Sequence, residues 1–189
     1  MLQAHFLAGE TVAFRAPALA DAEQAVRWLP GPFPWNAVQA ERLLREQETV
    51  PWGNAPTIRL IAVARETGEI LGGAEIERQE KRTAWITLTF GPDLAGAERE
   101  RLHAEALRIL VPWLLDELGL MTVTTALGDD EAALKAVAES LGMAEAVRLR
   151  AHLARPGGRA DLLWFQALNP RRTPRVDGGD GDAHLAHHA

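Results

Sequence analysis

The chain has 189 residues, of which 47% are hydrophobic and 24% are charged, and its formal net charge is −6. These values are typical of one globular domain with a buried core, and 189 residues are few for two domains. The acidic charge argues against nonspecific nucleic-acid binding, which depends on clustered Lys and Arg, and the absence of cysteine excludes disulfides, thiolate catalysis and cysteine-ligated zinc.

The first third of the chain predicts a strand followed by two helices. Residues 11–17 alternate apolar and polar side chains and are rich in strand formers, so we expect a strand there. Residues 18–29 gather apolar side chains on one helical face and end before Pro30, which predicts a helix. A proline-rich loop and a second helix over residues 37–48 follow.

The middle of the chain predicts three antiparallel strands and a long helix. Two β-rich runs within residues 57–79 flank Gly68, which can adopt the positive φ of a tight turn, so they predict a hairpin. Residues 82–91 predict the next strand. Residues 91–110 then lead into the helix, and we expect Pro112 to kink it.

The last third predicts a strand over residues 120–127, a helix over residues 128–143 and a hairpin over residues 144–168. The order of elements predicts an α/β (α+β) fold, with a mixed, mostly antiparallel sheet of about seven strands flanked by about four helices. We expect residues 1–168 to form this domain and residues 169–189, rich in Pro, Gly, Asp and His, to form a flexible tail.

The sequence predicts no membrane or metal-binding segment. The amino end lacks a basic start, and no apolar stretch approaches the roughly 20 residues of a membrane span, so we expect a cytoplasmic protein without membrane contact. The tail histidines have no fixed ligands beside them, and we interpret them as solvent-exposed rather than as a metal site. They are His184, His187 and His188.

Four segments in this order resemble the GNAT superfamily of acyl-CoA-dependent N-acetyltransferases, in particular the branch that includes the ribosomal-protein N-terminal acetyltransferases. The segments are FRAPALADAEQAVRWL, IAVARETGEILGGAEI, GPDLAG with AEALRILVPWLLDELGL, and EAALKAVAESLGM, of which the last two are the most specific. The resemblance covers about residues 11–168. It implies a GNAT-type fold and transfer of an acetyl group from acetyl-CoA to a primary amine, by direct attack without a covalent enzyme intermediate.

The resemblance also implies where the cofactor binds. In the family, a strand that ends in residues like Leu88, Thr89 and Phe90 splays from its neighbour, and the pantetheine arm hydrogen-bonds in the gap. We therefore expect an open V between the strand at Leu88 and the strand at Val123. The implied acceptor is an amine-bearing small molecule or a protein N-terminus, and two chains are expected to pair as a homodimer.

The pyrophosphate loop of the family, Arg/Gln-x-x-Gly-x-Gly before a Glu-Ala pair, is altered in this chain. Counting back from Glu105 fills the glycine positions with larger side chains, Arg99, Arg101 and His103. Counting forward from the preceding strand gives Gly96 the first glycine position, but three extra residues then precede the helix. Neither register reproduces the family pattern.

Two interpretations of this segment remain open. Arg99 or Arg101 could hold a phosphate through a charge-assisted contact of about 1.5–3 kcal/mol, which offsets a cost of about 1–2 kcal/mol for each non-glycine residue forced to positive φ. The other interpretation is a solvated helix start with i to i+4 charge pairs. We expect weaker cofactor binding than is usual in the family. The loop residues expected to bind the cofactor are Gly96, Ala97, Arg99 and Arg101.

Groups that carry catalysis in relatives are also replaced. Ala138 stands where many relatives have the tyrosine that protonates the departing thiolate, and the candidate replacement is Ser140, otherwise an ordinary exposed serine. Glu75 is the candidate general base if burial makes it basic enough, and otherwise forms a solvated carboxylate pair with Glu77. Trp85 takes a strand position where relatives often carry glutamate.

Aromatic residues surround the two proline-rich loops, a region that lies over the acceptor groove in relatives. Trp28, Phe33, Trp35 and Trp52 are interpreted as an acceptor pocket or partner surface, or as ordinary helix packing. The sequence thus leaves three functions open: an N-acyltransferase with an altered loop, a binding module that has lost turnover and perhaps its cofactor, and another acyl-CoA reaction on the same scaffold.

Overall fold

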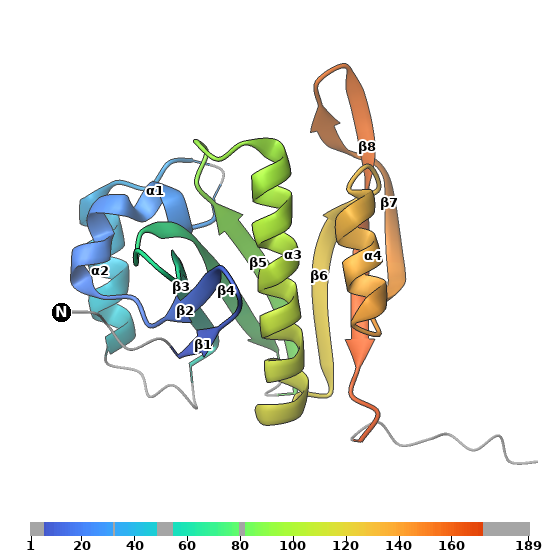
Figure 1. Cartoon of the computed structure of the whole chain (residues 1–189), viewed down its shortest axis with the longest axis horizontal. Coiled ribbons are helices and arrows are strands. Elements are labelled where there is room, and N and C mark those ends of the chain that lie inside the picture. Colours follow the sequence, from blue (N-terminus) through green and yellow to red (C-terminus); the bar gives the residue numbers. More distant parts are fainter. Residues whose placement is uncertain (1–5, 32, 49–54, 80–81, 172–189) are drawn as a thin grey trace, which may run out of the picture.

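The sheet is the centre of the molecule and carries helices on both faces (Figure 1). In this computed structural model, residues 6–31, 33–48, 55–79 and 82–171 are described. Within them, eight strands form one sheet in the order β1-β2-β3-β4-β5-β6-β8-β7. Neighbouring strands are antiparallel except β5 and β6, which run parallel.

The elements have the following bounds. The strands are β1 (Leu7–Ala8), β2 (Val12–Arg15), β3 (Thr57–Ala64), β4 (Ile70–Gln79), β5 (Thr83–Phe90), β6 (Thr122–Gly128), β7 (Ala144–Arg155) and β8 (Gly158–Leu168). The helices are the 3₁₀ turn η1 (Leu19–Gln24), α1 (Ala25–Trp28), α2 (Ala37–Glu48), α3 (Gly96–Pro112), the π-helical turn η3 (Trp113–Glu117) and α4 (Ala132–Ser140).

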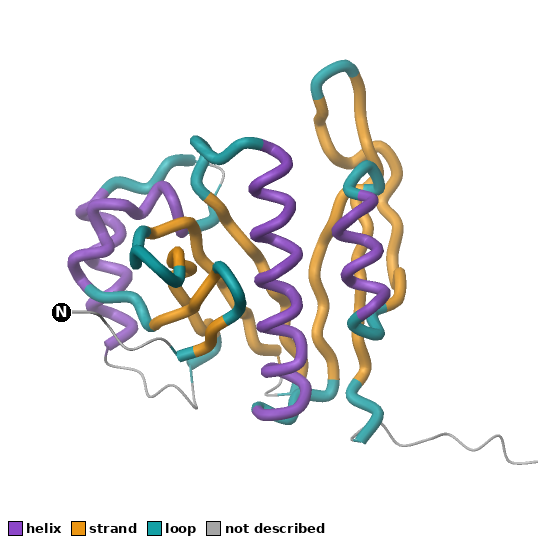
Figure 2. The backbone as a smooth tube through the Cα atoms, in the orientation of Figure 1, coloured by secondary structure: helices purple, strands orange, loops and turns teal. Residues whose placement is uncertain are grey.

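Two hydrophobic cores lie on opposite faces of this sheet. One core joins α3 and α4 to strands β2 to β6 and β8, and both helices run in front of the strands in Figure 2. The other core joins η1, α1 and α2 to β2, β3 and β4 around Trp28. Because this second core does not extend past β4, strands β5, β6 and β8 keep part of that face free for a groove.

A glycine in β4 and a buried ion pair hold η1 and α1 against the sheet. A Cβ added at Gly73 of β4 would lie 2.6 Å from the main-chain oxygen of Trp28, so glycine allows the helix to approach the strand closely. The buried ion pair between Arg15 and Asp21, with a 2.7 Å contact, ties β2 to η1. These contacts define one border of the free face.

The predicted fold class is confirmed, with differences in detail. β1 is an additional strand, because its two residues pair with the longer β2. The helix expected over residues 18–29 divides into η1 and the four-residue α1. At Pro112, the last residue of α3, the helix gives way to the π-helical turn η3, since proline lacks the N–H that would continue the α ladder.

Asn169, the first residue of the predicted tail, packs against the described domain. Asn169 is buried, and its side-chain amide donates to the main-chain oxygens of Leu115 and Leu120 at 2.6 and 3.0 Å. The predicted tail from residue 172 onward, with its histidines, lies outside the described residues. None of the helices described is both long enough and apolar enough to cross a membrane.

Candidate active site

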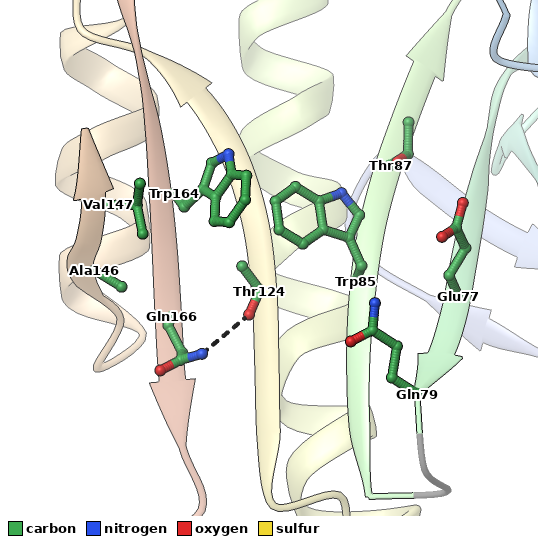
Figure 3. Close-up of a pocket in the computed structure, with 9 residues that line it drawn as sticks. All are labelled: Glu77, Gln79, Trp85, Thr87, Thr124, Ala146, Val147, Trp164 and Gln166. Carbon is green, nitrogen blue, oxygen red and sulfur yellow. Dashed lines mark hydrogen bonds between the residues drawn. The ribbon is translucent and has the colours of Figure 1, made fainter. Parts of the chain in front are cut away.

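The two parallel strands β5 and β6 separate at the middle of the sheet. Their pairing runs from Thr83 with Thr122 to Ile86 with Thr125, and beyond this pair the ribbons diverge (Figures 1 and 3). The Thr125 hydroxyl donates to the Ile86 main-chain oxygen at 3.2 Å, which closes the base of the opening. The expected V therefore exists, but Val123 is paired with Ala84 below the opening and does not border it.

Main-chain groups of β5 line one side of this V. The Gly91 N–H donates to Leu71 of β4 at 2.8 Å, and strand alternation then turns the amides of Leu88 and Phe90 away from β4, toward β6. Both residues lie beyond the last β5–β6 pair. Thr89, by the same alternation, directs its main-chain groups toward Gly73 of β4.

The helix α3 is the next element after β5 and begins at Gly96, after the short connection of residues 91–95. The residue before it, Ala95, provides no side-chain cap, and the Arg99 N–H already donates to Ala95 at 2.9 Å. Among the amides of the first turn, those of Gly96, Ala97 and Glu98 therefore have no carbonyl within the helix to bind. Because residues 99–103 are inside the helix, the register with a loop over these residues is wrong.

The two candidate phosphate ligands point to different places. Arg99 folds back over the helix start, and its guanidinium donates to the main-chain oxygen of Leu94 at 3.0 Å. Arg101 instead donates to the Thr11 hydroxyl at 3.1 Å and lies 4.0 Å from both Glu98 and Glu105. Arg99 thus lies beside the free amides, whereas Arg101 faces the start of β2.

Glu105 fixes α3 to β2. Its carboxylate accepts the N–H of Thr11 at 2.7 Å and the N–H of Val12 at 3.0 Å, as well as the Thr11 hydroxyl. Partial burial raises the pKa of Glu105, but these hydrogen bonds and the charge of Arg101 outweigh it and hold the pKa below its ordinary value. The middle of α3 is therefore held against the start of β2 by a carboxylate that is charged at neutral pH.

His103 lies in the second turn of α3, against the end of β5. Its ring centroid is 6.1 Å from that of Phe90, and its Nε2 atom is buried without a hydrogen-bond partner among the described residues. Burial lowers the pKa of His103 from 6.5 to about 4, so the imidazole is neutral at neutral pH. A buried polar atom of this kind is costly unless a ligand or water satisfies it.

A groove opens on the sheet face opposite α3, at the base of the V (Figure 3). It has a volume of about 570 Å³ and is lined by residues of β4, β5, β6, β7 and β8. Trp85 and Trp164 meet edge to face across it, with ring centroids 4.9 Å apart and an interplanar angle of 84°. Thr124, the β6 partner of Trp85, forms the floor between them and accepts from Gln166 at 3.4 Å.

The two candidate carboxylates share a strand face but differ in surroundings. Glu75 is mostly buried and accepts the Arg59 guanidinium at 2.6 Å, and it does not line the groove. Glu77 lines the groove opposite Trp85 and has no hydrogen bond or ion pair within the described part of the chain.

Ser140 lies on α4, away from the groove. Its hydroxyl donates to the main-chain oxygen of Val137 at 2.7 Å, one turn earlier in the helix. Ala138, at the position of the family's tyrosine, is fully buried between the helix and the sheet. Neither residue lines the groove.

Two of the four aromatic residues around the proline-rich loops, Trp28 and Trp35, pack against the protein. Trp28 is buried and donates its indole N–H to Asp21 at 2.9 Å, and Trp35 is half-buried and donates to Pro30 at 3.0 Å. Phe33 is 81% exposed. Trp52 lies outside the described residues. For Trp28, packing is therefore the observed role.

Three residues of the site do not stand out in the sequence as ligands or site residues: His103, Thr125 and Trp164. The only signal for His103 is that it occupies a position where the family pattern has a small residue. Strand alternation predicts that Trp164 shares a face with Gln166, but the neighbour across β6 depends on strand order. The same holds for Thr125, whose partner is on β5.

A family model and solved structures that are similar to this chain both describe acetyltransferases. Residues 9–144 match a family model described as an acetyltransferase (GNAT) domain. A crystal structure described as an acetyltransferase from Sphaerobacter thermophilus is 38% identical, with a TM-score of 0.68, and the alignment covers 90% of this chain and 99% of that chain. Among curated protein sequences, none matches this chain.

More distant structures share the fold alone. The ribosomal-protein-S5-alanine acetyltransferase from Vibrio fischeri is 14% identical over 91% of this chain and 100% of its own, with a TM-score of 0.61. A spermidine/spermine N-acetyltransferase from Vibrio cholerae is 14% identical over 84% of this chain and 93% of its own, also with a TM-score of 0.61.

Proposed function

The chain belongs to the GNAT acetyltransferase family, and from this we propose that it transfers an acetyl group from acetyl-CoA to a primary amine by direct attack. One observation carries the proposal: β5 and β6 stop pairing at Ile86 and Thr125, which leaves the main-chain groups of Leu88 and Phe90 beyond the last pair. The acceptor is an amine-bearing small molecule or a protein N-terminus, and the expected homodimer and cytoplasmic location stay predictions.

The donors around the V fit acetyl-CoA. The amides of Leu88 and Phe90 would hold the pantetheine arm, and the free amides of Gly96 and Ala97 would hold the pyrophosphate at a helix N-terminus. When bound there, acetyl-CoA would supply an activated acyl thioester.

We expect the phosphate site to be displaced from the position that the family's loop pattern implies. Because α3 starts at Gly96 rather than at residues 99–101, the free amides lie about 5–7 Å earlier along the helix axis. Arg99 can add a charge-assisted contact there by releasing Leu94. Arg101 would have to leave Thr11 to reach a phosphate, and Glu98 in the same turn opposes an anion.

The acceptor amine must lose a proton as it attacks. Glu75 remains our proposed general base, acting through water, with its carboxylate oriented by Arg59. Glu77, which lines the groove, is the alternative. The chain has no tyrosine to protonate the thiolate. Ser140 would have to release Val137 to do so, and we therefore propose that the thiolate takes its proton from solvent, with Ser140 as the alternative donor.

Calorimetric titration with acetyl-CoA and with CoA, combined with a thiol-release assay on simple primary amines, tests the proposal. We expect micromolar binding of both ligands and amine-dependent thiol release. Absence of binding at millimolar concentration would overturn the proposal. It would favour the second candidate, a binding module on the same fold, which the helical residues 99–103 and the buried Ala138 support.

A further inference from the structure

The groove at the base of the V has an unusual combination of lining groups. Two tryptophans and one carboxylate face it, together with the neutral polar side chains of Thr87, Thr124 and Gln166 (Figure 3). Among the described residues that line it, none is Lys or Arg. The groove therefore favours a ligand of positive charge over an anion.

The two indoles keep surface for a ligand. Trp85 and Trp164 are both half-buried, and their edge-to-face contact engages the edge of one ring and the face of the other. Neither indole N–H has a hydrogen-bond partner within the described part of the chain. The face of a tryptophan attracts cations through its negative quadrupole, more strongly than the face of any other aromatic side chain.

The carboxylate of Glu77 adds a negative charge to the groove beside Trp85, on the side away from Trp164. Glu77 is paired with Trp85 across β4 and β5, and Figure 3 shows its carboxylate on the groove side of the sheet. Its neighbour Glu75 is already neutralised by Arg59 at 2.6 Å, whereas Glu77 has no described counter-ion. A cation held against the indoles would provide one.

We propose that this groove binds a second, non-reacting cationic group of the acceptor, an ammonium or guanidinium, between the two tryptophans and Glu77. The inference rests on the proposed acetyl transfer, because it places the reacting amine at the adjacent V, beside Ile86 and Thr125. The substrate class is a small dicationic amine, for which a volume of about 570 Å³ is adequate.

The test is calorimetric titration with two probes, 1,4-diaminobutane and 4-amino-1-butanol. The second probe has a neutral hydroxyl in place of the distal ammonium of the first. We expect the wild-type protein to bind the diamine about 3- to 30-fold more tightly. This preference should disappear in Trp164→Leu and Glu77→Gln. It should persist in Trp164→Phe, which keeps an aromatic face, and in Glu139→Gln, a control on exposed Glu139 of α4.

Equal affinity for the two probes in the wild-type protein, or a preference that survives both Trp164→Leu and Glu77→Gln, would overturn the inference. Tighter binding of a peptide N-terminus than of the diamine would do the same. A thiol-release assay with both probes distinguishes this inference from the proposed acetyl transfer. If both probes are acetylated but the diamine is not preferred, acetyl transfer stands and the cation site is overturned. If acetyl-CoA does not bind, acetyl transfer is overturned, and calorimetry with the two probes still tests the cation site.

Discussion

The imidazole of His103 is neutral because it is buried against Phe90 and has no described partner for Nε2. Its pKa is lowered to about 4, so the folded protein takes up this proton at lower pH than the unfolded chain, whose value is 6.5. The stabilisation from this group is therefore complete above about pH 6.5 and is lost as the pH falls through 4.

We expect the free energy of unfolding to fall by on the order of 1–3 kcal/mol between pH 6.5 and pH 4 because of His103. Denaturant titrations of the wild-type protein and of His103→Gln across this range measure the effect. Glutamine is neutral throughout, so the difference between the two curves isolates His103 from carboxylates such as Glu105, which also titrate in acid. An NMR titration of His103 with a midpoint near 6.5 would contradict this expectation.

Thr125 closes the base of the V with one side-chain hydrogen bond. Its hydroxyl is buried and donates to Ile86 at the last β5–β6 pair. Thr125→Val should therefore lower the free energy of unfolding by about 1–2 kcal/mol, because the Ile86 oxygen loses a donor. Thr125→Ser keeps the hydroxyl and serves as the control. Equal stability of the two variants in denaturant titrations would show that the hydrogen bond contributes nothing measurable.

At the scale of elements, the position where α3 starts determines which main-chain amides are available to bind an anion. The helix begins at Gly96, where an added Cβ would meet nothing within 4 Å, so packing does not require glycine there. Glu105 holds the same helix against β2 through Thr11 and Val12. The middle of α3 is thus fixed against β2, and the amides of its first turn have no carbonyl within the helix to bind.

Arg99→Ala should weaken CoA binding about tenfold, because a charge-assisted contact to phosphate is lost. The same variant should leave binding of pantetheine, which lacks the pyrophosphate, unchanged. Calorimetry with both ligands measures the difference. Arg108→Ala, which removes an exposed arginine further along α3, is the matched control. If Arg99→Ala weakened both ligands equally, Arg99 would act on the fold of the helix start and not on phosphate.

At the scale of the whole molecule, the carboxyl end of β8 completes the fold beneath α3. Asn169 donates to Leu115 and Leu120 from its buried side chain, and its N–H donates to Met121 at 2.8 Å. These bonds join the end of the last strand to the turn that links α3 to β6. We therefore expect Asn169, one residue past the predicted boundary, to contribute to stability.

Truncation compares these two boundaries directly. A chain ending at Leu168 should lose about 1–3 kcal/mol of unfolding free energy relative to a chain ending at Arg171, because two buried carbonyls lose their donor. Thermal and denaturant unfolding of the two truncated proteins measure the loss. Equal stability would place the boundary at Leu168 and remove Asn169 from the core.

The sequence by itself determined the elements and their order, because hydrophobic periodicity and turn residues act locally. The sequence predicts the hairpin at Gly68, the bounds of α2 and the alternation of β5. It also identified the departures at Arg99, Arg101 and Ala138 from the family pattern. It left open whether the segment around Arg99 and Arg101 is a phosphate loop or a helix start, and the structure places both residues in the first turns of α3.

Only the tertiary structure decided which distant residues meet. Trp85 faces Trp164 because β8 follows β6 in the sheet, and the order of strands is not encoded in any local pattern. The same assembly neutralised Glu75 with Arg59 and left Glu77 without a described partner, although both share one strand face. Burial and counter-charge are properties of the packed chain, so the chemistry of the groove appears only when the sheet is formed.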